Sequence, residues 1–334
     1  MNYTAPKWLP GGNLQTIWPA LYSRQHGSPP FTYQRERWTT PDGDFIDVDW
    51  RPGATDAPLI VNFHGLEGSS NSHYAQAFAK FSSEQGYGFV VPHFRGCSGE
   101  ANRGPRAYHS GDFEEVGWIL NRMRERHQGP IFAVGVSLGG NALLRWAEEM
   151  GHDARRVVSA VTAVSSPVDL YASGQAIGRG FNRLVYTRMF LNSMKPKALD
   201  KLKQYPGLFD GASLARARDL YAFDNIFTAP LHGFKNTQDY WTRASAKPHL
   251  NQIRIPTLVV NARNDPFVPA WCLPQQSEIG AWVTLWQPEE GGHVGFPLGS
   301  PPGHVRWLPG AVGRWLAAQV SPHIASQKET TTHG

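Results

Sequence analysis

The sequence of 334 residues has little cysteine, no long apolar run and no block of like charge. Its two cysteines, Cys97 and Cys272, are too few to cross-link a chain of this length and form no C-x-x-C pair, which predicts a reduced, cytoplasmic setting. The first residues lack the basic start and apolar stretch of a secretory signal, and no window reaches the length of a membrane span. These absences predict a protein without a transmembrane segment and leave peripheral contact with lipid open.

The charges are few and mixed in sign. Lys and Arg total 32 against 27 Asp and Glu, a net charge of +5, and the basic residues are scattered among acidic ones. Because no basic stripe and no recognised reading module appears, we expect no nucleic-acid partner. Hydrophobic residues make up 41% of the chain, which is typical of a packed globular protein. The length allows one large α/β domain with an insertion.

Short apolar runs alternate with helical patterns through most of the chain, which is typical of a mainly parallel sheet flanked by helices. The expected strands are residues 59–63, 88–92, 131–136, 157–164, 256–260 and 282–286. The expected helices are residues 73–85, 113–126, 140–150 and 309–320. The sequence therefore predicts an α/β fold.

The alternation stops between residues 169 and 250, where no strand-like run occurs. Amphipathic stretches around residues 181–194 and 213–222 predict helices there, so we expect a helical insertion that caps the sheet. The expected organisation is an irregular lead-in packed on the core (1–30), a first core part (31–168), the cap insertion (169–250), a second core part (251–326) and a flexible tail (327–334).

The strongest chemical signal is the run Gly135-Val136-Ser137-Leu138-Gly139, which matches the nucleophile elbow G-x-S-x-G. An apolar strand precedes the run and a helical pattern follows it, as this motif requires. The glycines supply the room that a sharp turn needs, and the start of the helix directs N–H groups and a positive dipole end towards the serine. The run therefore predicts Ser137 as a catalytic nucleophile.

A serine hydroxyl needs a general base, and the base needs an acidic residue that orients it. The elbow motif implies that the acid and then the histidine follow the serine along the chain. Asp265 and His293 occur in this order, and each follows a predicted strand, with His293 in a glycine-rich loop. Asp169, which follows an earlier predicted strand, is an alternative acid, and a helix cap is the structural interpretation of either aspartate. We therefore expect His293 as the base and prefer Asp265 as the acid.

Acyl transfer also needs N–H donors for the negative charge that develops on the substrate oxygen. The backbone N–H of Leu138 is the expected first donor. The expected second donor is the N–H of Leu66, in the turn at 64–68 that follows a predicted strand. His64 is expected to shape this turn, because no companion metal ligands appear at regular spacing. The run at 95–100 lacks both glycine-rich phosphate-binding fingerprints, so we expect no cofactor and no metal.

A set of short motifs extends over nearly the whole chain, at residues 10–16, 64–68, 94–100, 108–111, 135–141, 232–234, 264–267 and 291–296. Together these motifs resemble the YheT-like branch of the α/β hydrolases, which includes eukaryotic ABHD-type lipid esterases and yeast medium-chain acyltransferases. The resemblance implies the α/β-hydrolase fold with a mostly parallel sheet. It also implies a triad of Ser137, Asp265 and His293 and esterase activity on short to medium acyl chains.

Together these observations predict a serine carboxylic-ester hydrolase that acts through an acyl-enzyme on short- to medium-chain acyl esters, with lipid-derived esters among the candidates. Transfer of the acyl group to an alcohol by the same triad is an alternative. A catalytically inert ligand-binding or scaffold protein is the alternative outside catalysis. Apolar residues at helical spacing in the insertion either line an acyl pocket or form the insertion's own core: Phe181, Leu184, Phe190, Leu191 and Met194.

Overall fold

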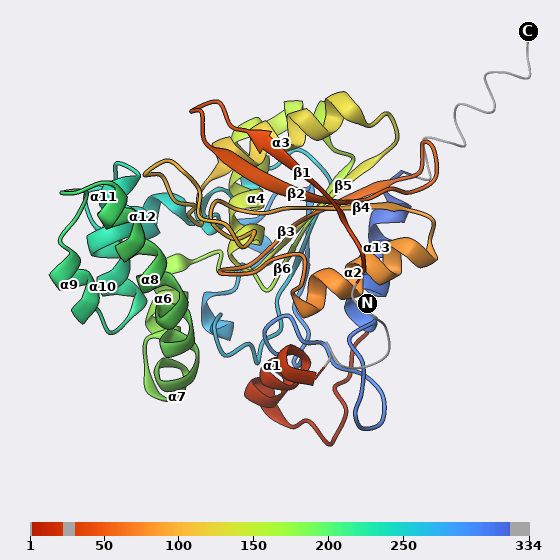
Figure 1. The fold of residues 1–334 in the computed structure, drawn as a ribbon. Coiled ribbons are helices and arrows are strands. Elements are labelled where there is room, and N and C mark those ends of the chain that lie inside the picture. The colour runs from red at the N-terminus through yellow and green to blue at the C-terminus, as the bar shows by residue number, and fades with distance from the viewer. Residues whose placement is uncertain (1, 23–30, 321–334) are drawn as a thin grey trace, which may run out of the picture.

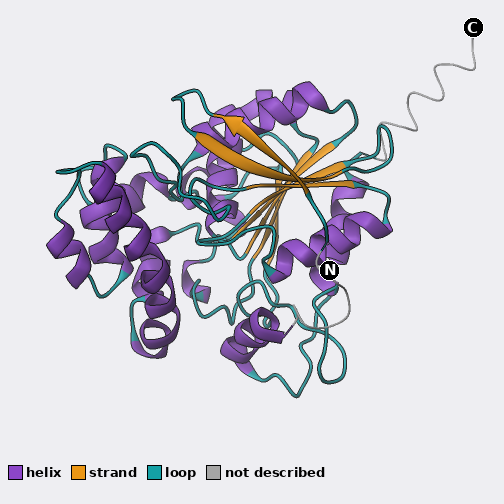
Figure 2. Cartoon of the chain, viewed as in Figure 1, coloured by secondary structure: helices purple, strands orange, loops and turns teal. Residues whose placement is uncertain are grey.

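The computed structural model of the chain describes residues 2–22 and 31–320, so the expected tail at 327–334 lies outside the described residues. Eight strands form one sheet in the order β1-β2-β4-β3-β5-β6-β7-β8 (Figures 1 and 2). β2 pairs antiparallel with β1 and with β4, and all other neighbours pair parallel. The strands are β1 (Gln34–Thr39), β2 (Phe45–Arg51), β3 (Leu59–Phe63), β4 (Gly88–Pro92), β5 (Ile131–Val136), β6 (Ala160–Val164), β7 (Thr257–Val260) and β8 (Val283–Trp286).

Helices cover both faces of this sheet. α2 (His73–Glu84) and α13 (Trp307–Ala318) lie on one face, and α3 (Phe113–Arg126) and α4 (Leu138–Met150) lie on the other (Figure 1). Every residue of β3, β4, β5, β6 and β7 is buried. A strand that is covered on both faces needs an apolar side chain at nearly every position, which is the pattern read from the sequence. The predicted α/β fold is confirmed.

The N-terminal region differs from the prediction. The lead-in, expected to be irregular, contains α1 (Gly11–Tyr22), whose two glycines and proline are weak helix formers, so that tertiary contacts account for this helix. Strand β1 has no alternation of apolar residues, whereas β2 alternates apolar and charged residues and was still not predicted. Arg35 and Arg37 on β1 pair with Asp49 and Asp47 on β2, at 2.7 and 2.8 Å. Cross-strand ion pairs therefore help to hold β1 at this edge of the sheet.

Residues 157–164, expected as one strand, divide into two elements. The short helix α5 (Ala154–Val157) closes with a bond from the N–H of Val158 to the carbonyl of Ala154, and β6 begins only at Ala160. Val157 and Val158 match the apolar pattern of a strand, but in the structure they form the end of helix α5. The other short elements near the sheet are 3₁₀ turns, namely η1 (Gly151–Asp153), η5 (Ala270–Cys272) and η6 (Gln276–Glu278).

Helices and turns make up the whole described connection between β6 and β7, and they lie beyond one end of the sheet as a separate layer (Figures 1 and 2). They are α6 (Leu170–Ile177), α7 (Gly180–Asn182), η2 (Arg183–Thr187), α8 (Arg188–Gln204), α9 (Gly211–Arg216), α10 (Leu220–Phe223), η3 (Asp224–Thr228), α11 (Ala229–Leu231), α12 (Thr237–Ala244) and η4 (Lys247–Gln252). No helix within residues 2–22 and 31–320 has both the length and the apolar character needed to cross a membrane.

One buried side chain joins this helical layer to the core. Asn141 on α4 donates from Nδ2 to the carbonyl oxygens of Ser110 and Ala244, at 2.8 Å each. Its Oδ1 accepts the N–H of Ala246 at 3.1 Å. Asn141 therefore satisfies three buried backbone groups, and it holds the end of α12 against the helix that follows Ser137.

Candidate active site

Ser137 lies in the turn between β5 and α4 and has a positive φ of 53°. A residue with a side chain seldom adopts this conformation, and the surrounding glycines allow the turn to pack closely. A Cβ atom at Gly139 would lie 2.4 Å from the carbonyl oxygen of His64, and one at Gly140 would lie 1.9 Å from Ser166 Oγ. Only glycine fits at these two positions, so the elbow motif reflects close contact with neighbouring segments.

Three of the residues singled out in the sequence meet at this turn. His293 Nε2 lies 3.0 Å from Ser137 Oγ, and His293 Nδ1 lies 2.8 Å from Asp265 Oδ2. All three groups come from loops at the carboxyl ends of parallel strands β5, β7 and β8. The arrangement has the order and contacts of a nucleophile, a base and an acid that orients the base.

Asp265 is itself held in place. Its Oδ1 accepts the N–H groups of Phe267 and Val268, at 2.7 and 3.2 Å, which leaves Oδ2 for His293. The ring of Phe267 lies against the imidazole, with 4.1 Å between the ring centres. These contacts restrict both the carboxylate and the imidazole to one orientation.

Asp169, the alternative acid, has another role in the structure. Its side chain accepts the N–H of Ala172 at 2.9 Å and caps the N-terminus of α6. Asp169 is therefore a helix cap, which was the structural interpretation considered from the sequence. The carboxylate beside His293 is that of Asp265.

Helix α1 supports the loops that carry the acid and the base. Thr16 Oγ1 accepts the N–H of His293 at 2.8 Å. The fully buried Gln15 accepts, at its Oε1, from Asn264 Nδ2 and from the N–H of Gly291, each at 2.9 Å. Sequence reasoning placed both residues in a family motif but assigned them no role, because their partners lie more than 240 positions away. The only available signal was a polar run inside an otherwise apolar lead-in.

The N–H groups of Leu66 and Leu138 donate to no other group within the described part of the chain, and both residues line the same cavity as Ser137. The turn that holds Leu66 is fixed on either side of it. The N–H of Gly65 donates to Tyr74 Oη at 2.8 Å, and that of Glu67 donates to Tyr108 Oη at 2.9 Å. Two unpartnered donors beside a serine can stabilise a developing oxyanion.

The side chain of His64 holds this turn through two hydrogen bonds. Its Nδ1–H donates to the carbonyl of Gly65 at 2.8 Å, and its Nε2 accepts the N–H of Phe94 at 3.0 Å. Burial lowers the pKa of His64 to about 3, so the ring is neutral. No group of three or more metal-binding side chains gathers anywhere in residues 2–22 and 31–320.

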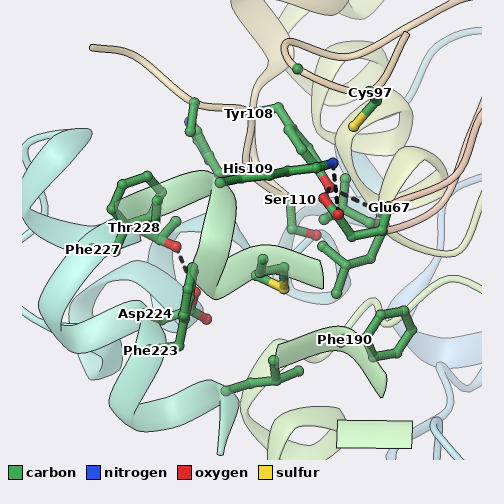
Figure 3. Close-up of a pocket in the computed structure, with 18 of the residues that line it drawn as sticks. Glu67, Cys97, Tyr108, His109, Ser110, Phe190, Phe223, Asp224, Phe227 and Thr228 are labelled. Atoms are coloured by element: carbon green, nitrogen blue, oxygen red, sulfur yellow. Dashed lines mark hydrogen bonds and ion pairs between the residues drawn. The ribbon is translucent and has the colours of Figure 1, made fainter. Parts of the chain in front are cut away.

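A cavity of about 530 Å³ extends from Ser137 and His293 between the sheet and the helical layer (Figure 3). Its walls are mainly apolar, and ligand pockets of this size are common in enzymes. From the helical layer come Ile177, Phe190, Met194, Phe223 and Phe227, and from the segment at 95–111 come Tyr108, His109 and Ser110. The segment at 95–111, for which the sequence indicated no role, forms one wall of this cavity.

The five apolar residues of the insertion divide between different environments. Phe190 and Met194 line the cavity, whereas Leu191 packs inside the helical layer. Phe181 and Leu184 do neither, since they are 52% and 73% exposed. Each of the two interpretations of this helical spacing therefore holds for part of the set.

Glu67 connects the turn at 64–68 to α8. Its carboxylate accepts from Tyr108 Oη at 3.0 Å (Figure 3). It also accepts from Lys197 Nζ at 2.7 Å and from the hydroxyl of Ser193. Because Lys197 and Ser193 belong to α8, the helical layer contacts the residue next to Leu66. Sequence reasoning did not single out Glu67, whose partners on α8 are more than 100 positions away.

Three buried titratable groups that line the cavity have shifted pKa values. Burial raises the pKa of Asp224 to about 6, although Thr228 and Trp241 donate hydrogen bonds to its carboxylate (Figure 3). Burial and the neighbouring His232 hold the pKa of His109 well below its usual value. Burial also raises the pKa of Cys97 to about 12, which makes its thiol a poor nucleophile. Among these groups, none has the contact with an imidazole that Ser137 Oγ has.

Comparison with known families agrees with the fold. A family profile described as alpha/beta hydrolase fold matches residues 58–300. The structure of alpha/beta hydrolase domain-containing protein 10 from mouse superimposes with a TM-score of 0.53 and 16% identity, covering 85% of this chain and 99% of that one. At this identity the similarity concerns the fold alone.

Sequence relatives define the branch. The Escherichia coli protein named "Putative esterase YheT" is 41% identical over 310 residues, 91% of this chain and 89% of that protein. Phospholipase ABHD3 of Mus musculus is 28% identical over 302 residues, 87% of this chain and 73% of that protein. The chain therefore belongs to the α/β-hydrolase family and, within it, to the YheT-like branch, which confirms the resemblance inferred from its motifs.

Proposed function

We propose that the protein is a serine hydrolase of carboxylic esters that acts through an acyl-enzyme. The observation that carries the proposal is the continuous chain of contacts from Ser137 Oγ through the His293 imidazole to Asp265, at 3.0 and 2.8 Å, at the wall of an apolar cavity. The names of the relatives, an esterase and a phospholipase, support ester hydrolysis.

The first half of the reaction forms the acyl-enzyme. His293 Nε2 takes the proton of Ser137 Oγ as this oxygen attacks the ester carbonyl. Asp265 holds the imidazole so that Nε2 faces the serine, and it stabilises the positive charge that the ring acquires. The N–H groups of Leu66 and Leu138 donate to the oxyanion of the tetrahedral intermediate. His293 then gives its proton to the alcohol, which leaves.

The second half releases the acid. Water loses a proton to His293 Nε2 and attacks the acyl carbonyl, and the same two N–H groups stabilise the second oxyanion. Collapse of this intermediate returns the proton to Ser137 Oγ and frees the carboxylic acid. Every proton that leaves one group is therefore received by another named group, and the resting state is restored.

The acyl chain occupies the apolar cavity, where residues 169–250 form a cap over the site. Phe190 and Met194 contribute walls from the cap, and Phe267 contributes a wall beside His293. A cavity of about 530 Å³ suits acyl chains of short to medium length. The proposal includes a cytoplasmic location, because two buried cysteines remain reduced in that compartment.

Labelling with a fluorophosphonate probe tests the nucleophile, because such probes react with activated serines. Wild-type protein should be labelled, and Ser137→Ala should not be labelled while retaining the wild-type melting temperature. Equal labelling of the two proteins, or no labelling of the wild type, contradicts the proposal. A series of p-nitrophenyl esters of increasing chain length then tests the cavity, and analysis of products formed with ethanol present separates hydrolysis from acyl transfer.

A further inference from the structure

The stretch that runs from α7 through η2 into α8 exposes a set of large apolar side chains. They are 36% to 73% exposed: Phe181, Leu184, Val185 and Met189. All four lie within nine consecutive residues and point towards solvent, and together they are here called the 181–189 face. Tyr186 and Leu191, in the same stretch, are buried. Large apolar side chains gathered on a protein surface are typical of an interaction site.

Arginines without acidic partners surround the 181–189 face. Arg179, Arg183 and Arg188 are exposed, and none of them forms an ion pair with a described residue. From residue 170 to residue 199 the chain holds three arginines and two lysines but no Asp or Glu. An apolar helix face flanked by basic residues is the pattern of a helix that lies in the interface of an anionic membrane.

Helix α1 lies beside this stretch of chain. Tyr186 Oη donates to Asn13 Oδ1 at 2.8 Å, and Ile17 packs against the cluster that contains Tyr186. Leu14 and Leu21 on α1 are 45% and 57% exposed, and α1 contains no acidic residue. Figure 1 shows α1 and α7 on the same lower side of the molecule. The neighbouring helix therefore adds exposed leucines and no negative side chain to this part of the protein.

The other side of this stretch reaches the candidate active site. Phe190 and Met194, one and five positions beyond Met189, line the cavity that also contains Ser137. A lipid surface seated on the 181–189 face would lie directly behind this wall of the cavity. Cavity-lining residues thus follow the exposed ones directly along one short piece of chain.

We propose that the 181–189 face binds the surface of an anionic lipid bilayer. The apolar side chains enter the region between headgroups and acyl chains, and Arg183 and Arg188 contact lipid phosphates. A second copy of this chain fits the face less well, because a symmetrical contact would set these arginines against their own copies without counter-charges. The interaction is separate from ester hydrolysis and does not require it.

Flotation with lipid vesicles tests the proposal on the full-length chain. The wild-type protein should float with vesicles of phosphatidylcholine that contain phosphatidylglycerol, and not with phosphatidylcholine alone. Arg183→Gln/Arg188→Gln should weaken binding by about fivefold per arginine replaced. Arg216→Gln/Arg218→Gln, on exposed cap residues outside this face, makes the same change in net charge and should bind as wild type does.

The apolar part is tested by Phe181→Ser/Leu184→Ser, which should lower vesicle binding by roughly tenfold or more. Leu184→Met keeps an apolar side chain and should bind normally, and a thermal melt of each variant monitors folding. Ser137→Ala should also bind normally, so that failure of the catalytic assignment is distinguished from failure of this one. Absence of flotation by wild type, or equal losses in the two arginine pairs, overturns the proposal. A dimer in solution that Phe181→Ser/Leu184→Ser dissociates, without vesicle binding, overturns it as well.

Discussion

The replacement Asp265→Asn tests how the imidazole of His293 is oriented. In the protein, Oδ1 of Asp265 accepts the N–H groups of Phe267 and Val268, and Oδ2 accepts from His293 Nδ1. In asparagine the two backbone donors keep the carbonyl oxygen at the Oδ1 position, so the amide NH₂ group faces Nδ1. A donor in that place moves the ring proton to Nε2, and Nε2 then has no lone pair to receive the proton of Ser137.

We expect kcat to fall by about 10⁴-fold, the scale of the loss when the wrong tautomer is imposed on a serine triad. This corresponds to ~5.4 kcal/mol of transition-state stabilisation, because each factor of ten represents ~1.36 kcal/mol. The melting temperature should change little, since the side chain keeps its size and its two backbone donors. The assay is the initial rate of p-nitrophenyl ester hydrolysis, with the rate of fluorophosphonate labelling as a measure of the serine alone.

Asp169→Asn is the matched control, because Asp169 is the other aspartate that follows a strand and it caps α6. Asparagine caps helices about as well as aspartate, so activity and stability should both stay close to wild type. If Asp265→Asn retains more than a tenth of the wild-type kcat, the orientation argument is wrong. If Asp169→Asn causes the large loss, the acid has been misassigned.

Two further predictions concern stability. Asn141→Ala leaves three buried backbone groups without partners, at ~1–2 kcal/mol each, so the free energy of unfolding measured in urea should fall by roughly 3–6 kcal/mol. Asn192→Ala, at an exposed position of α8, is the control and should have almost no effect. Equal effects of the two changes would refute the role of Asn141. Asp224 has a folded-state pKa of about 6, above its usual 3.8, so the native state retains this proton to higher pH than the unfolded state does and loses ~2 kcal/mol of stability as the pH rises from 4 to 7. Asp224→Asn should abolish that loss. The measurement is the unfolding free energy of the variant minus that of the wild type, at pH 4 and at pH 7. If this difference is the same at both pH values, the burial argument is contradicted.

Much of the fold could be predicted from local patterns in the sequence. The apolar runs that became β3, β4 and β5 were predicted within one residue, because strands covered on both faces are apolar throughout. The elbow around Ser137 was readable for a similar reason, since strand, glycine-flanked serine and helix follow one another directly in the chain. Strand β1 was not readable, because its stabilising partners are charged residues of β2.

Tertiary structure decided what depends on segments that are distant in sequence. Asp169 and Asp265 had the same local context, and only the packing of the loops determined which carboxylate lies 2.8 Å from His293. The buried contacts of Gln15 and Thr16 likewise depend on loops near the other end of the chain. The even helical spacing from Phe181 to Met194 gave no indication that one side would line a cavity while another faced solvent. A side chain's neighbours are set by the folded arrangement of several segments, whereas its conformational preference is set by the few residues beside it.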